Sequence, residues 1–126
     1  TAAQVRASLS LVTGSYVPTL TNVANVAATT AYAGYYVRIN DIVIVTGSLE
    51  IDATAAASTV TQMGQTLPVA SNFTNTAQLN GVAINAASKA EIQITSDITN
   101  DRANWYFLSQ TTTNVVFSYV FGYAIL

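Results

Sequence analysis

The sequence VVFSYVFGYAI, residues 115–125, places an apolar or aromatic side chain at every second position. A period of two is that of a β-strand with one buried face. At about 3.3 Å per residue the run spans roughly 36 Å, well beyond an average strand. We therefore expect a central strand that runs the length of the domain or bends near Gly122. The residues expected to fill the core, or in part a subunit interface, are Val115, Phe117, Tyr119, Phe121, Tyr123 and Ile125.

A hairpin is predicted upstream of this strand, at residues 35–39 and 42–52. Asn40-Asp41 separates the two runs, and both residue types tolerate the positive φ angles of a tight turn. In the second run, Val43 and every second residue to Ile51 share one face, which we expect to be buried. The other face is polar only in its later half, so we expect its beginning, Ile42 and Ile44, to be covered as well.

The remaining segments continue the same pattern. Residues 53–59 read as a loop, and residues 66–69 as an extended run in which Pro68 favours a sheet edge. Residues 81–85 and 91–95 form a second candidate pair of strands around 86–89, Asn100-Asp101 marks a turn, and 103–108 is a strand followed by a polar loop at 109–114. The period of two predicts an all-β, antiparallel fold with one domain.

Residues 1–13 differ from the rest and are predicted to form an N-terminal arm ahead of a domain at 14–126. Val5, Leu9 and Val12 suit one face of a short helix, whereas residues 8–12 also alternate as a strand. Because a free tail would carry fewer apolar residues, we expect the arm to pack on a neighbouring subunit. The alternative is a frayed terminus.

Charge is scarce in this chain, which has four basic and six acidic residues, no histidine and no cysteine. Charged residues make up 8% of the sequence, against about 25% in average proteins. General acid/base catalysis, thiol nucleophiles and transition-metal sites draw on the missing residue types, so we expect no enzyme, cofactor or metal site. The few cations leave no basic stripe for nucleic acid, and no apolar run is long enough for a membrane helix. With 51% hydrophobic residues, some apolar surface is expected to contact a partner.

Two acidic groups could suggest chemistry, but simpler explanations are stronger. Asp97, Asn100 and Asp101 lack the ligand spacing of a calcium loop and suit a turn. Glu50 and Asp52 share a strand face, where solubility is the commoner reason for a carboxylate pair.

The residues we single out for recognition are apolar or aromatic. Tyrosine and tryptophan supply rigid contact area and could stack on sugar rings, although half-buried positions in a sheet are the stronger explanation of these residues. The candidate interface consists of Val5, Leu9, Val12, Tyr35, Tyr36, Trp105 and Tyr106.

Several blocks together resemble a known module. They are GSYVPTLTNVANV at 14–26, YYVRINDIVIVTGSLEIDATA at 35–55, QTLPVASNF at 65–73, NDRANW at 100–105 and FSYVF at 117–121. In this order they are similar to the β-sandwich module of tailed-bacteriophage virion proteins, which occurs in head decoration (cement) proteins and in distal tail-fibre domains. The resemblance implies a jelly-roll-like antiparallel β-sandwich and a homotrimer. It carries over no functional residue.

The resemblance implies a structural role in a virion. Because only about thirteen residues precede the module, where fibres carry a long shaft, we expect a capsid decoration protein. It would lie on the outer surface of the phage head and stabilise it by binding the major capsid protein. The alternative is a tail-fibre tip that recognises a bacterial surface glycan or protein.

Overall fold

The computed structural model describes residues 1–85, 87 and 91–126, and the predicted turn at 86–89 lies outside this part except for Ala87. The all-β prediction is confirmed. One short helix and ten strands form in the described part: α1 (Ala2–Ser8), β1 (Leu11–Tyr16), β2 (Leu20–Ala24), β3 (Val26–Ala31), β4 (Gly34–Ile39), β5 (Ile42–Ala53), β6 (Thr59–Gln65), β7 (Leu79–Ile84), β8 (Glu91–Asp97), β9 (Arg102–Ser109) and β10 (Val115–Ala124).

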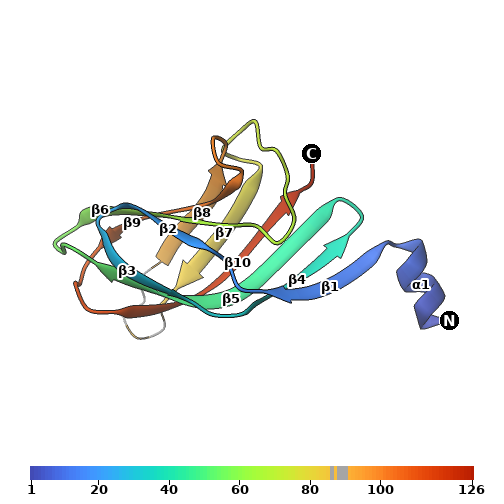
Figure 1. Ribbon diagram of the computed structural model, residues 1–126, viewed down its shortest axis with the longest axis horizontal. Coiled ribbons are helices and arrows are strands. Elements are labelled where there is room, and N and C mark those ends of the chain that lie inside the picture. The colour runs from blue at the N-terminus through green and yellow to red at the C-terminus, as the bar shows by residue number, and fades with distance from the viewer. Residues whose placement is uncertain (86, 88–90) are drawn as a thin grey trace.

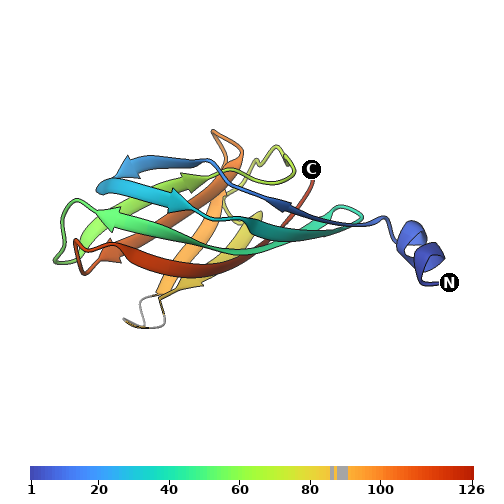
Figure 2. The same ribbon diagram turned by 60° about the horizontal axis from the view of Figure 1, so that its bottom comes forward.

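The strands belong to one antiparallel sheet in the order β1-β4-β5-β10-β7-β8-β9-β6-β2, with β3 beside β5. The long β5 pairs with β4 along its first half and with β3 along its second half. Strand β2 pairs with β6, and β3 pairs with β5. Only Asn25 separates β2 from β3, so these two adjacent strands link the β6 end of the sheet to β5. The sheet therefore curls around a single interior, as Figures 1 and 2 show. A jelly-roll sandwich is not confirmed.

The predicted central strand β10 lies between β5 and β7. Its inward side chains Phe117, Tyr119, Phe121 and Tyr123 are buried, which confirms their assignment to the core. The ring of Trp105 on β9 meets Phe117 and Tyr119 edge-on, with centroids 6.4 Å and 5.5 Å away. Such contacts add to the burial of apolar area, so β10 and Trp105 organise the core.

The hairpin β4–β5 is confirmed, with Ile39 opposite Ile42 and Asn40 at a φ of 52°. The inward face of β5 is buried as expected. The expectation that the beginning of its other face is covered is wrong. Ile42 and Ile44 are 50% and 45% exposed, because nothing in the described chain packs on that side of the sheet.

Strands β2, β3 and β6 were not predicted, and residues 66–69, expected to be extended, lie outside the strands. Strand β6 has inward-facing Thr61 and Gln65 beside Met63, all fully buried. Polar inward residues hide the alternation of apolar and polar positions on which the prediction relied. Strand β6 is nonetheless central, because it joins β9 to β2.

The sequence left a helix and a strand open for the N-terminal residues, and the structure contains both, with α1 followed by β1. A capping box between Thr1 and Gln4 starts α1, and none of its residues is buried. Strand β1 begins at Leu11 and pairs with β4 along its whole length, so it crosses the predicted arm boundary at residue 13. Both views show α1 at one end, away from the curled sheet (Figures 1 and 2). No helix among the described residues is long and apolar enough to span a membrane.

A series of hydrogen bonds inside the core joins Trp105, Gln65 and Tyr16. Nε1 of Trp105 donates to Oε1 of Gln65 at 2.9 Å, and Nε2 of Gln65 donates to the Tyr16 hydroxyl at 3.1 Å. The buried Tyr119 hydroxyl has no hydrogen-bond partner among the described residues. Burial raises the pKa of Tyr119. Only glycine fits beside this hydroxyl, because a Cβ at Gly34 would lie 2.8 Å from it.

Single and double substitutions at Gly34 and Tyr119 test the close packing of these two residues. Gly34→Ala should destabilise the protein by about 1–3 kcal/mol through overpacking. Tyr119→Phe should be neutral or slightly stabilising, because it removes a buried hydroxyl without a partner. In the Tyr119→Phe background Gly34→Ala should cost less, since the nearest remaining atom, the Thr46 carbonyl oxygen, lies 3.2 Å from the added Cβ.

Urea denaturation of the four proteins measures these free energies of unfolding. Gly122→Ala is the matched control, because its nearest neighbour would lie 3.6 Å away. An equal cost of Gly34→Ala in both backgrounds would contradict the steric explanation.

Candidate interaction surface

The side of the sheet that faces away from the core is apolar over its central strands. Besides Ile42 at the start of β5, the strands β5, β10 and β7 expose five large aliphatic side chains here, each close to half exposed. We call this set the outer patch: Ile44, Val82, Ile84, Val116 and Val120. Charged groups are costly to desolvate, so an uncharged apolar surface of this kind suits contact with a partner.

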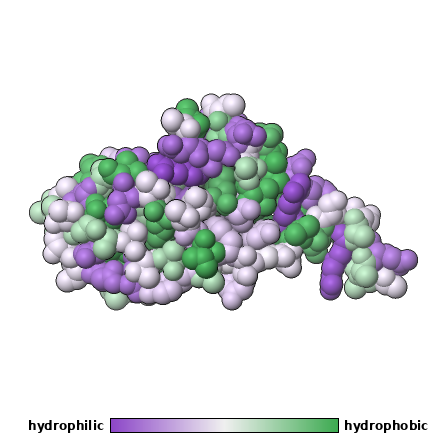
Figure 3. Space-filling model, in the orientation of Figure 1, coloured by the Kyte–Doolittle hydropathy of each residue, from purple (hydrophilic) through white to green (hydrophobic). Residues whose placement is uncertain are grey.

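Strand register makes the outer patch continuous. Val120 lies opposite Val82 on one side, and Gly122 lies opposite Ile44 on the other. One row further along, Ser118 on β10 lies opposite Ile84. Figure 3 shows one face of the whole molecule, on which hydrophobic, weakly polar and hydrophilic residues are intermixed.

Glu50 marks one end of the outer patch, opposite Val116. Its carboxylate accepts hydrogen bonds from the Tyr32 hydroxyl and from Nδ2 of Asn114. These two donors lower the pKa of Glu50. The carboxylate is thus held by neighbours at the rim of the patch, and Asp52 does not share those hydrogen bonds.

Two predicted interface residues lie on the same outer side but far apart. Tyr35, 63% exposed, lies opposite Thr46 beside the patch, and Tyr106 is half exposed on β9. Five strand steps separate β4 from β9. At about 4.8 Å per step they are roughly 24 Å apart along the curved sheet, so they do not form one aromatic clamp.

Trp105 is removed from the candidate interface. It is 0% exposed, because β9 directs it into the core against the aromatic face of β10. Tyr36 is half-buried and lies over Gly14, with its ring edge-on to Tyr16 at 6.4 Å. Both residues serve packing within this chain.

Val5, Leu9 and Val12 are all exposed and follow one another along the N-terminal segment. Val5 lies on α1, Leu9 caps its C-terminal end, and Val12 lies on β1. The helix α1, which carries Val5, projects at one end of the molecule (Figure 2).

The outer patch was not predicted, although its signal was present in the sequence. Val116 and Val120 occupy the positions between the aromatic residues of β10, and Ile42 and Ile44 occupy the equivalent phase of β5. Apolar residues on both phases of a strand indicate that both faces are covered in some state.

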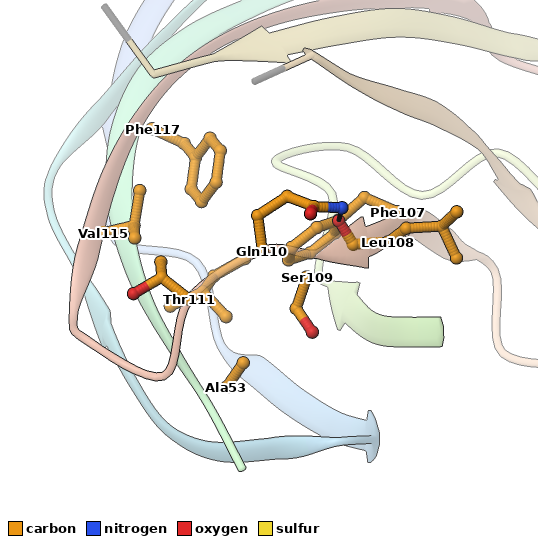
Figure 4. A pocket seen from close by; sticks show the side chains of 9 residues that line it. Ala53, Phe107, Leu108, Ser109, Gln110, Thr111, Val115 and Phe117 are labelled. Atoms are coloured by element: carbon orange, nitrogen blue, oxygen red, sulfur yellow. Dashed lines mark hydrogen bonds between the residues drawn. The ribbon is translucent and has the colours of Figure 1, made fainter. Parts of the chain in front are cut away.

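A small cavity of about 50 Å³ opens at the end of the sheet between β5, β9 and β10. Figure 4 shows its lining, which includes Phe107, Phe117, Val115 and Ala53. Its polar side chains are Ser109, Gln110 and Thr111. The Ser109 hydroxyl donates to the Ala55 carbonyl oxygen at 2.6 Å. The cavity therefore offers apolar surface and no reactive group.

The acidic turn at 97–101 is held by hydrogen bonds. The Asp97 carboxylate accepts from Nε of Arg102 at 2.7 Å and from the backbone and side chain of Asn100. The Asp101 carboxylate instead accepts from the backbone N–H groups of residues 71–73. In the described part of the chain, no group of three or more acidic, histidine or cysteine residues could hold a metal.

Comparison with family models, with curated proteins and with solved structures finds no match to this chain.

The Asp97 turn gives the stability a predictable pH dependence. Burial alone would raise the pKa of Asp97, but hydrogen bonds from Asn100 and Arg102 outweigh it and lower the pKa. A lowered pKa stabilises the fold above the unfolded value of about 3.9. That stability should be lost as the pH falls through the lower pKa of the folded state.

Urea midpoints measured from pH 6 down to about pH 2 test this sign. The wild type should lose stability over the acid range more steeply than Asp97→Asn, which has no proton to gain. Asn100→Ala, which removes donors to the carboxylate, should fall between them. Parallel curves for all three proteins would rule out Asp97 as a source of acid sensitivity.

Proposed function

We propose that this protein is a non-enzymatic structural protein of a bacteriophage virion, a capsid decoration protein on the outer surface of the head. In this proposal it associates as a homotrimer and stabilises the head by binding the major capsid protein. The trimer and the virion location rest on the resemblance of residues 14–126 to virion modules. The outer patch is the observation that supports an interaction role.

The argument from the outer patch is one of desolvation. Val120, Val82 and Ile84 lie side by side with no charged residue among them. Carboxylates lie at the rim of the patch, where Glu50 is opposite Val116 and Glu91 is opposite Ile84. Burying the uncharged centre of the patch at each copy of a repeated interface therefore avoids the cost of desolvating ions. A standard interface buries about 800 Å² per partner, and many such contacts reinforce one another through avidity.

We also propose that the curled sheet is a jelly-roll-like sandwich of two layers. Strands β4, β5, β10 and β7 would form one layer and β8, β9, β6 and β2 the other, with Trp105 and the aromatic residues of β10 between them. The first layer would then present the outer patch to the capsid or to the other subunits.

A charge placed in the outer patch tests the proposal. Val120→Asp should leave the fold intact, because Val120 is 46% exposed, and should abolish binding to phage particles that lack this protein. The matched control is Val60→Asp on β6, which is 43% exposed and lies outside the patch.

Particle survival after heat or osmotic shock is the readout. Wild-type protein and Val60→Asp should restore resistance to particles without the protein, and Val120→Asp should not. Particles that resist both challenges equally with and without the protein would contradict the decoration role. Quantitative mass spectrometry of virions adds the copy number, which for a shell protein should scale with that of the major capsid protein.

A second candidate function is receptor binding by a tail-fibre tip, and one observation favours it. Tyr35 lines a shallow surface hollow together with Thr13, Ser15 and Thr46. An exposed aromatic ring beside hydroxyl groups is a surface on which a sugar ring stacks. Binding to a panel of bacterial surface glycans that is lost in Tyr35→Ala, together with a low copy number in virions, would favour this function over decoration.

A further inference from the structure

Strand β1 is an open edge of the sheet. It ends the strand order and pairs with β4 through six successive residues, from Leu11 opposite Ile39 to Tyr16 opposite Gly34. Within the described residues no strand lies along its other side. Alternate backbone N–H and C=O groups of β1 therefore point outward, where another strand could pair with them.

This edge lacks the features that normally block such pairing. Charged residues, prolines and β-bulges are the usual protection of an edge strand. The sequence of β1, LVTGSY, contains no charge and no proline, and its register has no shift. By contrast, the edge strands β2 and β3 have register shifts at residues 22–24 and 26–28. The chain is thus protected at two edges and open at β1.

The segment ahead of β1 also lacks a partner within the described chain. Helix α1 has seven residues and none of them is buried. A helix of this length is marginal in water without tertiary contacts. Val5 is 58% exposed on it, so α1 presents apolar surface that a contact with another chain would bury.

We propose that β1 pairs with β1 of a second copy of this chain, antiparallel and across a twofold axis. The free backbone groups specify a strand as the occupant, and the second copy supplies a strand with the same open edge. A twofold axis perpendicular to the sheet keeps each side chain on its own face, so one residue near the middle of β1 lies opposite its own copy. With Thr13 or Gly14 at the axis, no charges oppose each other.

The antiparallel arrangement also accounts for α1. Since α1 precedes Leu11, it lies beyond the Tyr16 end of the other copy's β1, next to Val17. Val17, 65% exposed, is the most exposed large apolar side chain of the described residues. Apolar residues of α1 thereby meet an apolar partner at each end of the paired strands.

A second copy therefore fits the open edge in backbone pairing and in apolar surface.

This contact goes beyond the proposed function, because it concerns the edge of the sheet and not the outer patch. A twofold contact joins copies in pairs and doubles whatever unit forms elsewhere. A chain that otherwise remains a monomer becomes a dimer, and a homotrimer becomes a pair of trimers when its three β1 edges all meet the same second trimer.

Light scattering after size-exclusion chromatography of the full chain is the first test. Thr13→Lys/Ser15→Lys adds charge at two exposed positions of β1, where pairing would bring like charges together. The molar mass should fall to half that of the wild type. Thr21→Lys/Val23→Lys on the shifted edge strand β2 is the matched control and should keep the wild-type mass. Equal masses for the wild type and the β1 variant would overturn the inference.

Disulfide trapping is the second test and does not depend on the lysine variant folding. The chain has no cysteine, so Thr13→Cys/Ser15→Cys introduces the only thiols. If the axis passes through Thr13, this residue faces Thr13 of the other copy. If the axis passes through Gly14, Thr13 faces Ser15 of the other copy. Both registers therefore allow a crosslink. Oxidation should yield a covalent dimer. Its absence, or equal crosslinking of Thr21→Cys/Val23→Cys, would overturn the inference.

The two proposals fail in different experiments. A halved mass together with unprotected particles would overturn the decoration role and leave the β1 contact in place. A mass that the β1 variant does not change, with Val120→Asp still unable to protect particles, would overturn only the β1 contact.

Discussion

The inward aromatic face of β10 is the constraint on which this structure depends. Phe117, Tyr119, Phe121 and Tyr123 require an interior on one side of a single long strand, and the sheet supplies it by curling until β9 places Trp105 against them. The flanking strands must then leave room for these rings. Glycines at close approaches such as Gly34 follow from the position of the Tyr119 phenol and not from local backbone preference.

A sheet curled around one aromatic interior leaves its outer side without cover. In the described chain, the outer patch of β5, β10 and β7 and the open edge of β1 are the consequences, and they differ in chemistry. The outer patch offers apolar side chains, so any partner of suitable shape could bury them. The edge offers backbone groups, which only another extended strand satisfies. We therefore propose the outer patch as the surface for the capsid and β1 as the site of contact between two copies.

Sequence reasoning succeeded where burial of one face matched a simple period of two. It found β10, the β4–β5 hairpin and the turn at Asp101, where the residue types and the apolar pattern agree. It missed β6, whose inward Thr61 and Gln65 are polar and find their partners only in the folded core. It also placed Trp105 at a candidate interface, because alternation along β9 identifies two faces without telling which of them the sheet encloses.

By itself, the sequence determined that this protein is an antiparallel β-protein with few charged residues and with neither histidine nor cysteine. These properties follow from composition and from the local period of side chains, which do not depend on how distant segments meet. Only the tertiary structure decided that Ile44 and Val120 remain exposed while Trp105 is buried, and that β1 is left at an edge. The reason is physical: exposure and pairing depend on which strands become neighbours, and strand order in a curled sheet is set by contacts between residues far apart in the chain.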